Sequence, residues 1–275
     1  MSLPRFGPHD DPGPDFAALL RLTGAGPESG PLGAAAQHPQ APAEIPHGTT
    51  CVAVRYHSGV VLAGDRRATA GHLISNHRIE KVFPADRHSG VAIAGAAGPS
   101  AEMVRLFQLQ LEHYEKVEGT PISLEGKANQ LGQMVRANLP SAMQGLVVVP
   151  IFAGFDTAAS KGRIFEYDVT GGRYEERDHA ATGSGSLHAD TVVKLGYRPS
   201  MARAAAVDLV LDALFVASDA DAATGGPDPV RGVFPVVAVI DADGYKRLDD
   251  AELRRRTERL LRRHRSRREG DGSAS

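Results

Sequence analysis

A glycine-threonine dipeptide, Gly48-Thr49, is followed at equal spacing by an aspartate and a lysine, Asp65 and Lys81. A threonine hydroxyl is a weak nucleophile unless a base lies next to it, and a free N-terminal amine is one such base. If the chain is cut between Gly48 and Thr49, the freed amine of Thr49 lies beside its own hydroxyl. We therefore predict that Thr49 becomes a nucleophile and that the working chain begins at this residue.

The charged residues have clear roles if the strands around them converge at one end of a sheet. Lys81 would place positive charge beside the Thr49 hydroxyl and ease the loss of its proton. Asp65 would neutralise Lys81, because a buried ammonium group without a partner is costly. The Thr49 amine would act as general base and general acid, and the N–H of Gly95 would face an oxyanion. Taken alone, the spacing of Asp65 and Lys81 favours the simpler interpretation of a surface salt bridge.

Strands and helices follow one another in blocks along the chain. Alternating or continuous apolar runs predict strands at Thr50–Tyr56, Val60–Ala63, Lys81–Phe83, Val91–Ala94, Leu146–Phe155, Arg163–Asp168, Arg173–Arg177 and Val233–Ile240. Helical periodicity predicts helices around 104–114, 124–135, from Ser186 onward, and from an N-cap at Ser200 through Leu214. This order favours two layered sheets with helices packed outside them.

Composition excludes several classes of protein. Hydrophobic residues make up 42% of the 275 residues, which is typical of a globular protein, and the net charge of -2 argues against nucleic-acid binding. The single cysteine, Cys51, allows no intramolecular disulfide, fits a reducing cytoplasm, and is interpreted as a small buried filler. Apolar stretches such as Leu146–Gly154 are too short to span a bilayer, and the N-terminus does not resemble a secretory signal.

Both ends of the chain differ from its middle. Residues 1–48 are rich in Pro, Gly and Ala and are expected to be largely disordered, either as a linker or as a removable propeptide. A peptidase domain is expected over 49–250. Residues 251–275 are rich in arginine, which predicts a solvated helix that ends in a tail, with an anionic docking site as the alternative.

Several motifs, taken in order, resemble a proteasome β subunit of the actinobacterial type. The resemblance covers the chain from Thr49 to about Ile240 and rests on the segments 47–50, 64–69, 81–83, 94–95, 182–186 and 221–226. It implies an α+β fold, the four-layer αββα sandwich of N-terminal nucleophile hydrolases, in which two antiparallel sheets are flanked by helices. It also implies that the subunit cleaves itself between Gly48 and Thr49 and acts as a threonine endopeptidase without a cofactor or metal.

The same resemblance assigns roles to individual residues. Thr49 resembles the nucleophile, Asp65 and Lys81 its charge partners, and Gly95 the oxyanion donor. Ser184 and Asp221 resemble the polar groups around the threonine amine, and Thr224 stands where the family usually has serine. Thr69 resembles the position whose backbone pairs with the substrate. The residues expected to line the substrate pocket are apolar, which predicts broad cleavage after apolar residues: Ala68, Ile79, Phe83, Ile93, Ala97 and Ala101.

The resemblance further implies partners and a location. We expect α subunits and other β subunits in a barrel of four stacked seven-membered rings, an ATP-driven unfoldase ring, and unfolded or tagged protein substrates in the cytoplasm. No nucleic acid or membrane partner is expected. Two alternatives are a two-ring heat-shock threonine peptidase, which usually lacks the segment Asp65–Arg67, and a non-catalytic ring subunit. A scaffold would have no use for Thr49, Asp65 and Lys81 together.

Overall fold

The computed structural model describes residues 48–71 and 73–272, with side chains described as far as 266. The chain separates into two units, Met1–Ala43 and Glu44–Ser275, and all of the described residues belong to the second. The expectation of a disordered segment over 1–48 therefore lies outside the described residues, except at Gly48. None of the described helices is long and apolar enough to cross a membrane.

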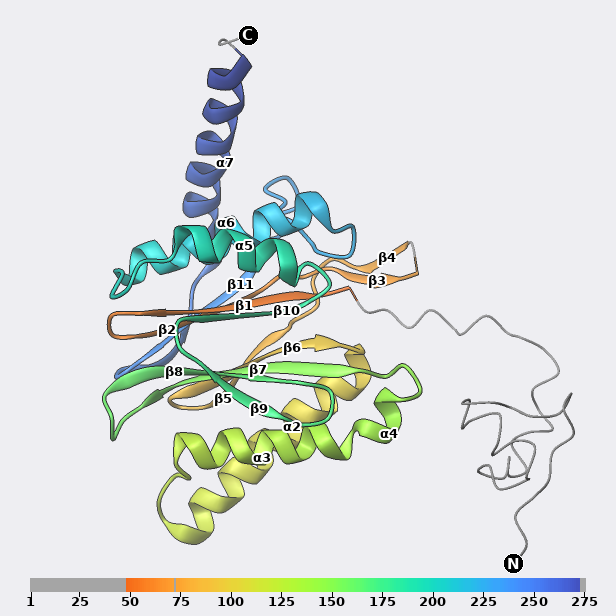
Figure 1. Cartoon of the computed structure of the whole chain (residues 1–275), viewed down its shortest axis with the longest axis vertical. Helices are drawn as coiled ribbons and strands as arrows, with labels where there is room; N and C mark the ends of the chain where they lie inside the picture. Colours follow the sequence, from red (N-terminus) through yellow and green to blue (C-terminus); the bar gives the residue numbers. More distant parts are fainter. Residues whose placement is uncertain (1–47, 72, 273–275) are drawn as a thin grey trace, which may run out of the picture. The chain divides into compact units, whose positions relative to one another are not determined.

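Two five-stranded antiparallel sheets form the middle of this unit (Figure 1). The first has the order β10 (His179–Gly183), β1 (Thr50–Tyr56), β2 (Gly59–Gly64), β11 (Val236–Asp241), β12 (Gly244–Arg247). The second has the order β5 (Val82–Asp86), β6 (Ser89–Gly95), β7 (Val148–Asp156), β8 (Lys161–Tyr167), β9 (Arg173–Glu176). A separate hairpin pairs β3 (Ala68–Ala70) with β4 (Leu73–Asn76).

Helices cover the outer face of each sheet (Figure 1). The first sheet is covered by α5 (Ser186–Gly196) and α6 (Arg203–Ala220), with α7 (Asp250–Gly272) against α6. The second is covered by α2 (Ala97–Glu118) and α3 (Leu124–Ala137), and the short α4 (Leu139–Ala142) follows. The α2 helix ends at Gly119, whose left-handed φ of 72° a glycine adopts without strain.

Buried side chains divide into three clusters that correspond to the layers. Alternate residues of β1 point to opposite faces, so Val52 and Val54 pack against the helices, whereas Cys51 and Ala53 pack between the two sheets. A third cluster lies between the second sheet and α2 and α3, around Phe107. Because β1 and β2 are covered on both faces, their sequences are apolar almost throughout. The predicted αββα sandwich is therefore confirmed.

Several predicted boundaries differ from the structure by one to three residues, and two of the differences have a clear local cause. The α6 helix begins at Arg203 after Ala202, which caps it without a side-chain hydrogen bond, so Ser200 is not the N-cap; Ser200 lies in the preceding turn with a positive φ of 58°. The last buried strand begins at Val236 and not at Val233, because Val233 pairs with Asp228 in an isolated bridge.

One end of the two sheets gathers the predicted site. Thr50 at the start of β1 pairs with Gly183 at the end of β10, and Cys51 pairs with Gly64 at the end of β2. Asp65 directly follows β2, and Lys81 directly precedes β5. The strand ends thus bring Thr49, Asp65 and Lys81 together, which is the condition that their proposed roles require.

Candidate active site

Lys81 and Asp65 form a buried ion pair. Lys81 Nζ lies 2.7 Å from Asp65 Oδ1, and the two side chains are 5% and 0% exposed. Nζ also donates to the main-chain carbonyl of Arg67 at 2.6 Å. Removing either partner would leave an unpaired charge in the protein interior, which is strongly unfavourable. The pair is therefore not the surface salt bridge that the spacing alone favoured.

The Asp65 carboxylate also holds three main-chain segments. Oδ1 accepts the N–H of Thr50 at 2.9 Å. Oδ2 accepts the N–H of Arg67 at 2.9 Å and the N–H of Gly225 at 2.7 Å. Charge-assisted hydrogen bonds of this kind are stronger than neutral ones, so they fix the carboxylate in one orientation.

The peptide bond between Gly48 and Thr49 lies directly against this pair. Thr49 is 4% exposed, and its Oγ1 donates to the Gly48 carbonyl oxygen at 2.7 Å. Lys81 Nζ donates to the same oxygen at 3.3 Å. The carbonyl of Thr49 accepts the N–H of Ser184 at 2.9 Å, which fixes the other side of the residue. The hydroxyl and the ammonium group therefore meet at one carbonyl oxygen.

Gly48 has no room for a side chain. A Cβ atom at this position would lie 2.4 Å from the Cβ of Ala223 and 2.7 Å from Oγ1 of Thr69. A Cβ atom does not approach a non-bonded heavy atom this closely, so a larger residue would displace the peptide bond. Thr69, predicted to pair with substrate, thus lies next to the residue that precedes Thr49.

A network of hydroxyl groups surrounds Asp221. Its Oδ2 accepts hydrogen bonds from Ser184 Oγ at 2.5 Å and from Thr224 Oγ1 at 2.6 Å. Thr224 Oγ1 also lies 2.5 Å from Oγ1 of Thr50, which in turn accepts the N–H of Gly185 at 3.0 Å. The hydroxyl of Thr224 therefore occupies the network that a serine was expected to complete.

These hydrogen bonds change the acidity of Asp221. Burial raises the pKa of its carboxyl group, but the hydrogen bonds from Ser184, Thr224 and the main chain of Ala223 outweigh burial. The pKa of Asp221 is therefore lowered below its ordinary value. A negative charge is thus maintained next to Ser184, whose Oγ lies 3.5 Å from the carbonyl oxygen of Thr49.

Gly95 lies at the end of β6 with a positive φ of 121°, and a Cβ there would lie 2.0 Å from the carbonyl oxygen of Val147. The N–H of Ile93 donates to the carbonyl of Lys81 at 2.9 Å. Backbone direction alternates along a strand, so the N–H of Gly95 points to the same side as that of Ile93. The N–H of Gly95 therefore points toward the start of β5, next to Lys81. This direction is consistent with its expected role as the oxyanion donor.

The residues expected to line a substrate pocket lie in three places. Phe83 on β5 and Ile93 on β6 pack in the cluster beneath α2. Ala97 and Ala101 are exposed on the first turns of α2, which follows β6 directly. The remaining two, Ala68 and Ile79, are half-buried on β3 and in the segment before Lys81.

Cys51 lies on β1, 0% exposed, between the two sheets. Burial is the main cause that raises the pKa of its thiol to about 12. A thiolate is the reactive form of cysteine, so this residue is chemically inert at neutral pH. The prediction of a small buried filler is confirmed.

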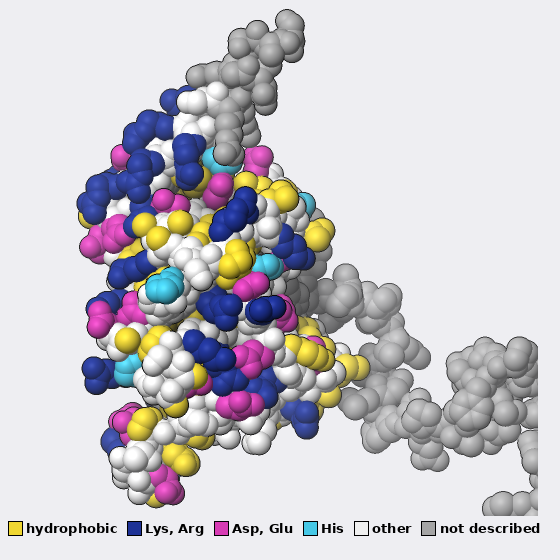
Figure 2. Space-filling model, turned by 60° about the vertical axis from the view of Figure 1, so that its left-hand side comes forward, with side chains coloured by type: hydrophobic (Ala, Val, Ile, Leu, Met, Phe, Trp, Pro, Cys, Tyr) yellow, Lys and Arg dark blue, Asp and Glu magenta, His cyan; other side chains and the backbone are white. Residues whose placement is uncertain are grey.

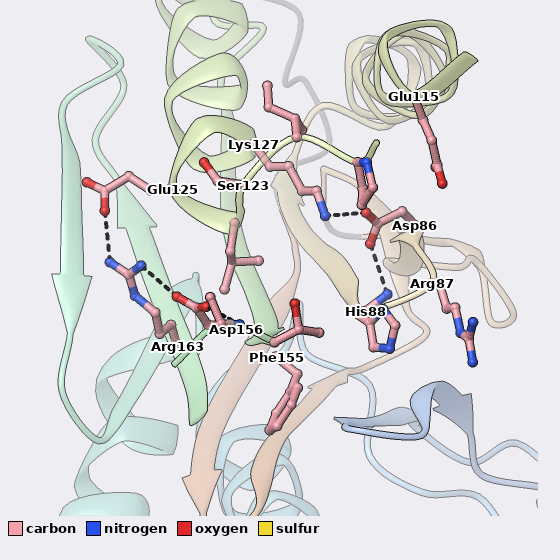
Figure 3. A pocket seen from close by; sticks show the side chains of 15 residues that line it. Asp86, Arg87, His88, Glu115, Ser123, Glu125, Lys127, Phe155, Asp156 and Arg163 are labelled. Atoms are coloured by element: carbon pink, nitrogen blue, oxygen red, sulfur yellow. Dashed lines mark hydrogen bonds and ion pairs between the residues drawn. The ribbon is translucent and has the colours of Figure 1, made fainter. Parts of the chain in front are cut away.

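A large polar cavity lies at the other end of the strands. It has a volume of about 550 Å³ and is bordered by the turn between β5 and β6, the end of β7 and the start of α3 (Figure 3). Lys127 pairs there with Asp86, and Arg163 pairs with Glu125 at 3.2 Å and Asp156 at 3.3 Å. Its buried cations are thus already matched by carboxylates.

Sequence reasoning missed the main-chain contributors to the site. The main-chain carbonyl of Arg67 accepts a hydrogen bond from Lys81, and the main-chain N–H of Gly225 donates one to Asp65. Every residue type carries these main-chain groups, so the sequence does not reveal which of them bind. The role of Thr50 was also missed: its hydroxyl connects Thr224 to the N–H of Gly185. The sequence did offer one indication of this role, because Thr50 directly follows Thr49 at the start of a predicted strand.

An αββα sandwich with a threonine at the start of an interior strand, beside a buried Lys-Asp pair, defines the fold class of the N-terminal nucleophile hydrolases. Comparison with known families narrows this class. Residues 45–230 match the family described as Proteasome subunit, and the chain belongs to this family.

Three curated relatives support the assignment, and each is named Proteasome subunit beta. The relative from Acidimicrobium ferrooxidans is 61% identical over 255 residues, covering 92% of this chain and 91% of the relative. The relative from Streptomyces griseus is 58% identical, covering 78% of this chain and 76% of its own length. The relative from Jonesia denitrificans is 54% identical, covering 76% and 69% respectively. The chain is thus a subunit of a proteasome particle, of the protease type.

Proposed function

We propose that this chain is a threonine endopeptidase of the proteasome core that frees its own nucleophile by cutting between Gly48 and Thr49. The observation that carries the proposal is the Gly48 carbonyl oxygen, which accepts hydrogen bonds from both Thr49 Oγ1 and Lys81 Nζ. The hydrogen bond from Lys81 polarises this carbonyl toward attack and stabilises the negative charge that develops on its oxygen, and the short contact with Thr49 Oγ1 places the attacking hydroxyl beside the carbonyl.

Self-cleavage is an acyl transfer followed by hydrolysis. Thr49 Oγ1 attacks the Gly48 carbonyl carbon, a C–O bond forms, and the C–N bond between the two residues breaks. The proton lost by the hydroxyl is gained by the nitrogen, and water then hydrolyses the ester. The products are a carboxylate on Gly48 and a free amine on Thr49.

Peptide substrates then follow the same chemistry. The Thr49 amine takes the hydroxyl proton and later gives it to the leaving amine, while Lys81 and Asp65 provide the charge environment. The Gly95 N–H supports the oxyanion, and Ser184, Asp221 and Thr224 hold the amine. Thr69 pairs with the substrate main chain, and Ala68, Ile79, Phe83, Ile93, Ala97 and Ala101 give a broad preference for apolar residues.

The surrounding assembly is part of the same proposal. Residues 1–48 act as a propeptide, 49–250 as the peptidase domain and 251–275 as an arginine-rich C-terminal segment. Seven-membered α and β rings enclose Thr49 in a chamber in the cytoplasm, and an ATP-driven ring delivers unfolded or tagged proteins. Support comes from the resemblance and from the beta-subunit names of the relatives.

The test is the intact mass of the chain co-expressed with its α partner, in wild type and in Thr49→Ala. We expect the loss of residues 1–48 in wild type and their retention in Thr49→Ala. Equal trimming of both chains would mean that another protease removes the segment. Retention in both, within an assembled particle, would favour a structural subunit.

A further inference from the structure

A cavity of about 330 Å³ lies next to the Asp65–Lys81 pair. Arg67 and Gly225, whose main-chain N–H groups bind Asp65, both line it. Its remaining walls come from β4 and the residues after it and from the segment that leads to β11. Only Arg67 and Gly225, which bind Asp65 directly, therefore lie between this part of the cavity and the ion pair of the candidate active site.

Positive charge dominates this cavity. Arg66, Arg67 and Arg231 line it, and Asp228 is the one carboxylate among its lining residues, all of which the structure describes. Arg231 Nη1 already pairs with Asp228 at 2.7 Å. The charges of Arg66 and Arg67 therefore have no counter-ion within the cavity.

The surroundings neutralise these two guanidinium groups poorly. Arg66 reaches Glu80 only at 3.7 Å, and Glu80 is engaged by Arg247 at 2.6 Å. Arg67 donates from Nη1 to the carbonyl of Ala222 at 2.8 Å and makes no ion pair within the described part of the chain. The Nε atoms of both arginines are buried without a hydrogen-bond partner. Unpaired buried donors and charges are costly, so a cavity of this kind favours an anion.

We propose that this cavity binds a phosphate group, free or carried by a small molecule, between the guanidinium groups of Arg66 and Arg67. Each guanidinium carries five N–H donors, and only one nitrogen of each has an acceptor here. Arginine is suited to bidentate binding of phosphate oxygens. One guanidinium group without an ion pair among the described residues, Arg67, and one that is only weakly paired, Arg66, together complement the charge of a phosphate dianion.

Binding there acts on Lys81 through the main chain, a consequence that rests on the proposed function. Arg67 donates its N–H to Asp65 at 2.9 Å and accepts from Lys81 Nζ at 2.6 Å. An anion that fixes the Arg67 side chain also fixes these two groups. Arg66 and Arg67 are thus positioning residues for Lys81, and an occupied cavity speeds self-cleavage.

The binding test uses the full chain carrying Thr49→Ala, so that it does not depend on cleavage. Inorganic phosphate is titrated calorimetrically at constant ionic strength, and we expect one saturable site. Arg66→Gln and Arg67→Gln weaken binding about tenfold or more, since a charged hydrogen bond is lost. Arg66→Lys keeps part of the affinity, and Arg105→Gln, on an exposed part of α2, changes nothing. Phosphate also raises the melting temperature of the parent chain more than that of Arg66→Gln. A cooperative melting transition of Arg66→Gln without phosphate shows that the variant is folded.

Titration with phenyl phosphate identifies the source of the ligand. Tighter binding than inorganic phosphate would point to a phosphorylated small molecule, and weaker binding to the free ion. Absence of a saturable site for both, or unchanged affinity in both glutamine variants, would overturn the proposal.

The link to Lys81 is tested separately in the chain with Thr49 intact. Phosphate is expected to increase the rate of loss of residues 1–48 severalfold in wild type and not in Arg66→Gln. Binding without a change in rate would refute the link while leaving the site. If wild type never cleaves, the proposed function fails, and the titration still decides the site.

Discussion

At the scale of single residues, Gly48 is as constrained as the predicted nucleophile beside it. Its position between Ala223 and Thr69 leaves no space for a Cβ atom. The Gly48 carbonyl must also stay in place to accept from both Thr49 Oγ1 and Lys81 Nζ. Displacing a reacting group by about 1 Å is enough to cost roughly a hundredfold in rate.

Gly48→Ala is therefore expected to slow self-cleavage by about tenfold to a hundredfold, because the added methyl group moves the carbonyl. The measurement is the rate of loss of residues 1–48, followed by intact mass. Gly98→Ala is the matched control, because nothing lies within 4 Å of a Cβ at Gly98. Equal rates for Gly48→Ala and wild type would show that the crowding around Gly48 is irrelevant to cleavage.

The hydroxyl network predicts a dependence of stability on pH. The pKa of Asp221 is lowered in the folded protein, so this carboxylate contributes stability above its unfolded pKa, near 3.9. That contribution is lost as the pH falls through the folded pKa. Ser184→Ala removes one hydrogen bond to the carboxylate and raises its pKa, which makes the contribution smaller.

In a Thr49→Ala background, Ser184→Ala is expected to lower the free energy of unfolding at pH 7 by under about 1 kcal/mol, since solvent screens this half-exposed group. The difference should shrink as the pH falls through the lowered folded pKa of Asp221, because the carboxylate is then protonated in both chains. Urea unfolding at several pH values measures it. Thr191→Ala, which removes a hydroxyl bonded to the Leu187 carbonyl, is the control without a carboxylate. A difference that stays constant with pH would contradict the assignment to Asp221.

At the scale of elements, the end of β10 is fixed by a glycine. Gly183 pairs with Thr50 across the strands, has a φ of 100°, and would place a Cβ 1.8 Å from the carbonyl oxygen of Thr49. A side chain there is excluded both by the left-handed backbone and by contact with the neighbouring strand. Gly183 thereby sets the distance between β10 and β1 at the candidate site.

Gly183→Ala is expected to destabilise the Thr49→Ala chain by more than about 2 kcal/mol, since strain and a steric clash add together. Gly119→Ala separates the two effects. Gly119 also has a positive φ, 72°, but nothing lies within 4 Å of its Cβ position. Urea unfolding of both variants gives the comparison. Equal losses would mean that the contact with Thr49 contributes nothing beyond backbone strain.

The elements also show what the sequence could predict. The long apolar strands and amphipathic helices gave the αββα layers correctly, because burial on both faces of β1 and β2 leaves a continuous apolar run. The short strand β10 consists mostly of small residues, and β3 has three residues, so neither carries enough periodicity to be found. The start of α6 was misplaced because Ser200 is a good N-cap residue in a conformation that does not cap.

The candidate site, too, could be predicted from the sequence only in part. Thr49, Asp65, Lys81, Ser184, Asp221 and Thr224 were proposed from residue types and resemblance, and the structure brings them together. The convergence of their strands could not be derived from spacing, since it depends on sheet register. The contacts of the Arg67 and Gly225 main chains depend on the fold alone.

At the scale of the whole molecule, the C-terminal helix is attached to the body, and its outer surface is cationic. Leu253 and Leu260 of α7 are buried with the residues of α6, and Arg256 pairs with Asp208 at 2.7 Å. Figure 2 shows Lys and Arg side chains gathered over α7. The segment expected as a solvated helix therefore has one buried face.

Leu260→Ala in the Thr49→Ala chain is expected to lower the free energy of unfolding by about 2–5 kcal/mol, because it leaves a cavity beneath α7. Arg262→Ala, exposed on the same helix, is expected to change it by less than about 0.5 kcal/mol. Urea unfolding measures both. A small effect of Leu260→Ala would mean that α7 is not part of the cooperative unit.

The contacts of Asp65 have a consequence for the order of events during synthesis. Asp65 binds Gly225, 160 residues further along the chain, and Thr50 bonds to Thr224, 174 residues away. Contacts of such high sequence separation form late, after the chain between them has been made and has folded. A growing chain therefore carries Thr49, Asp65 and Lys81 from early on but lacks the segment that aligns them. If the proposed self-cleavage occurs, this sequence separation would delay cleavage of the peptide bond before Thr49 until the segment around Gly225 has been made and has folded.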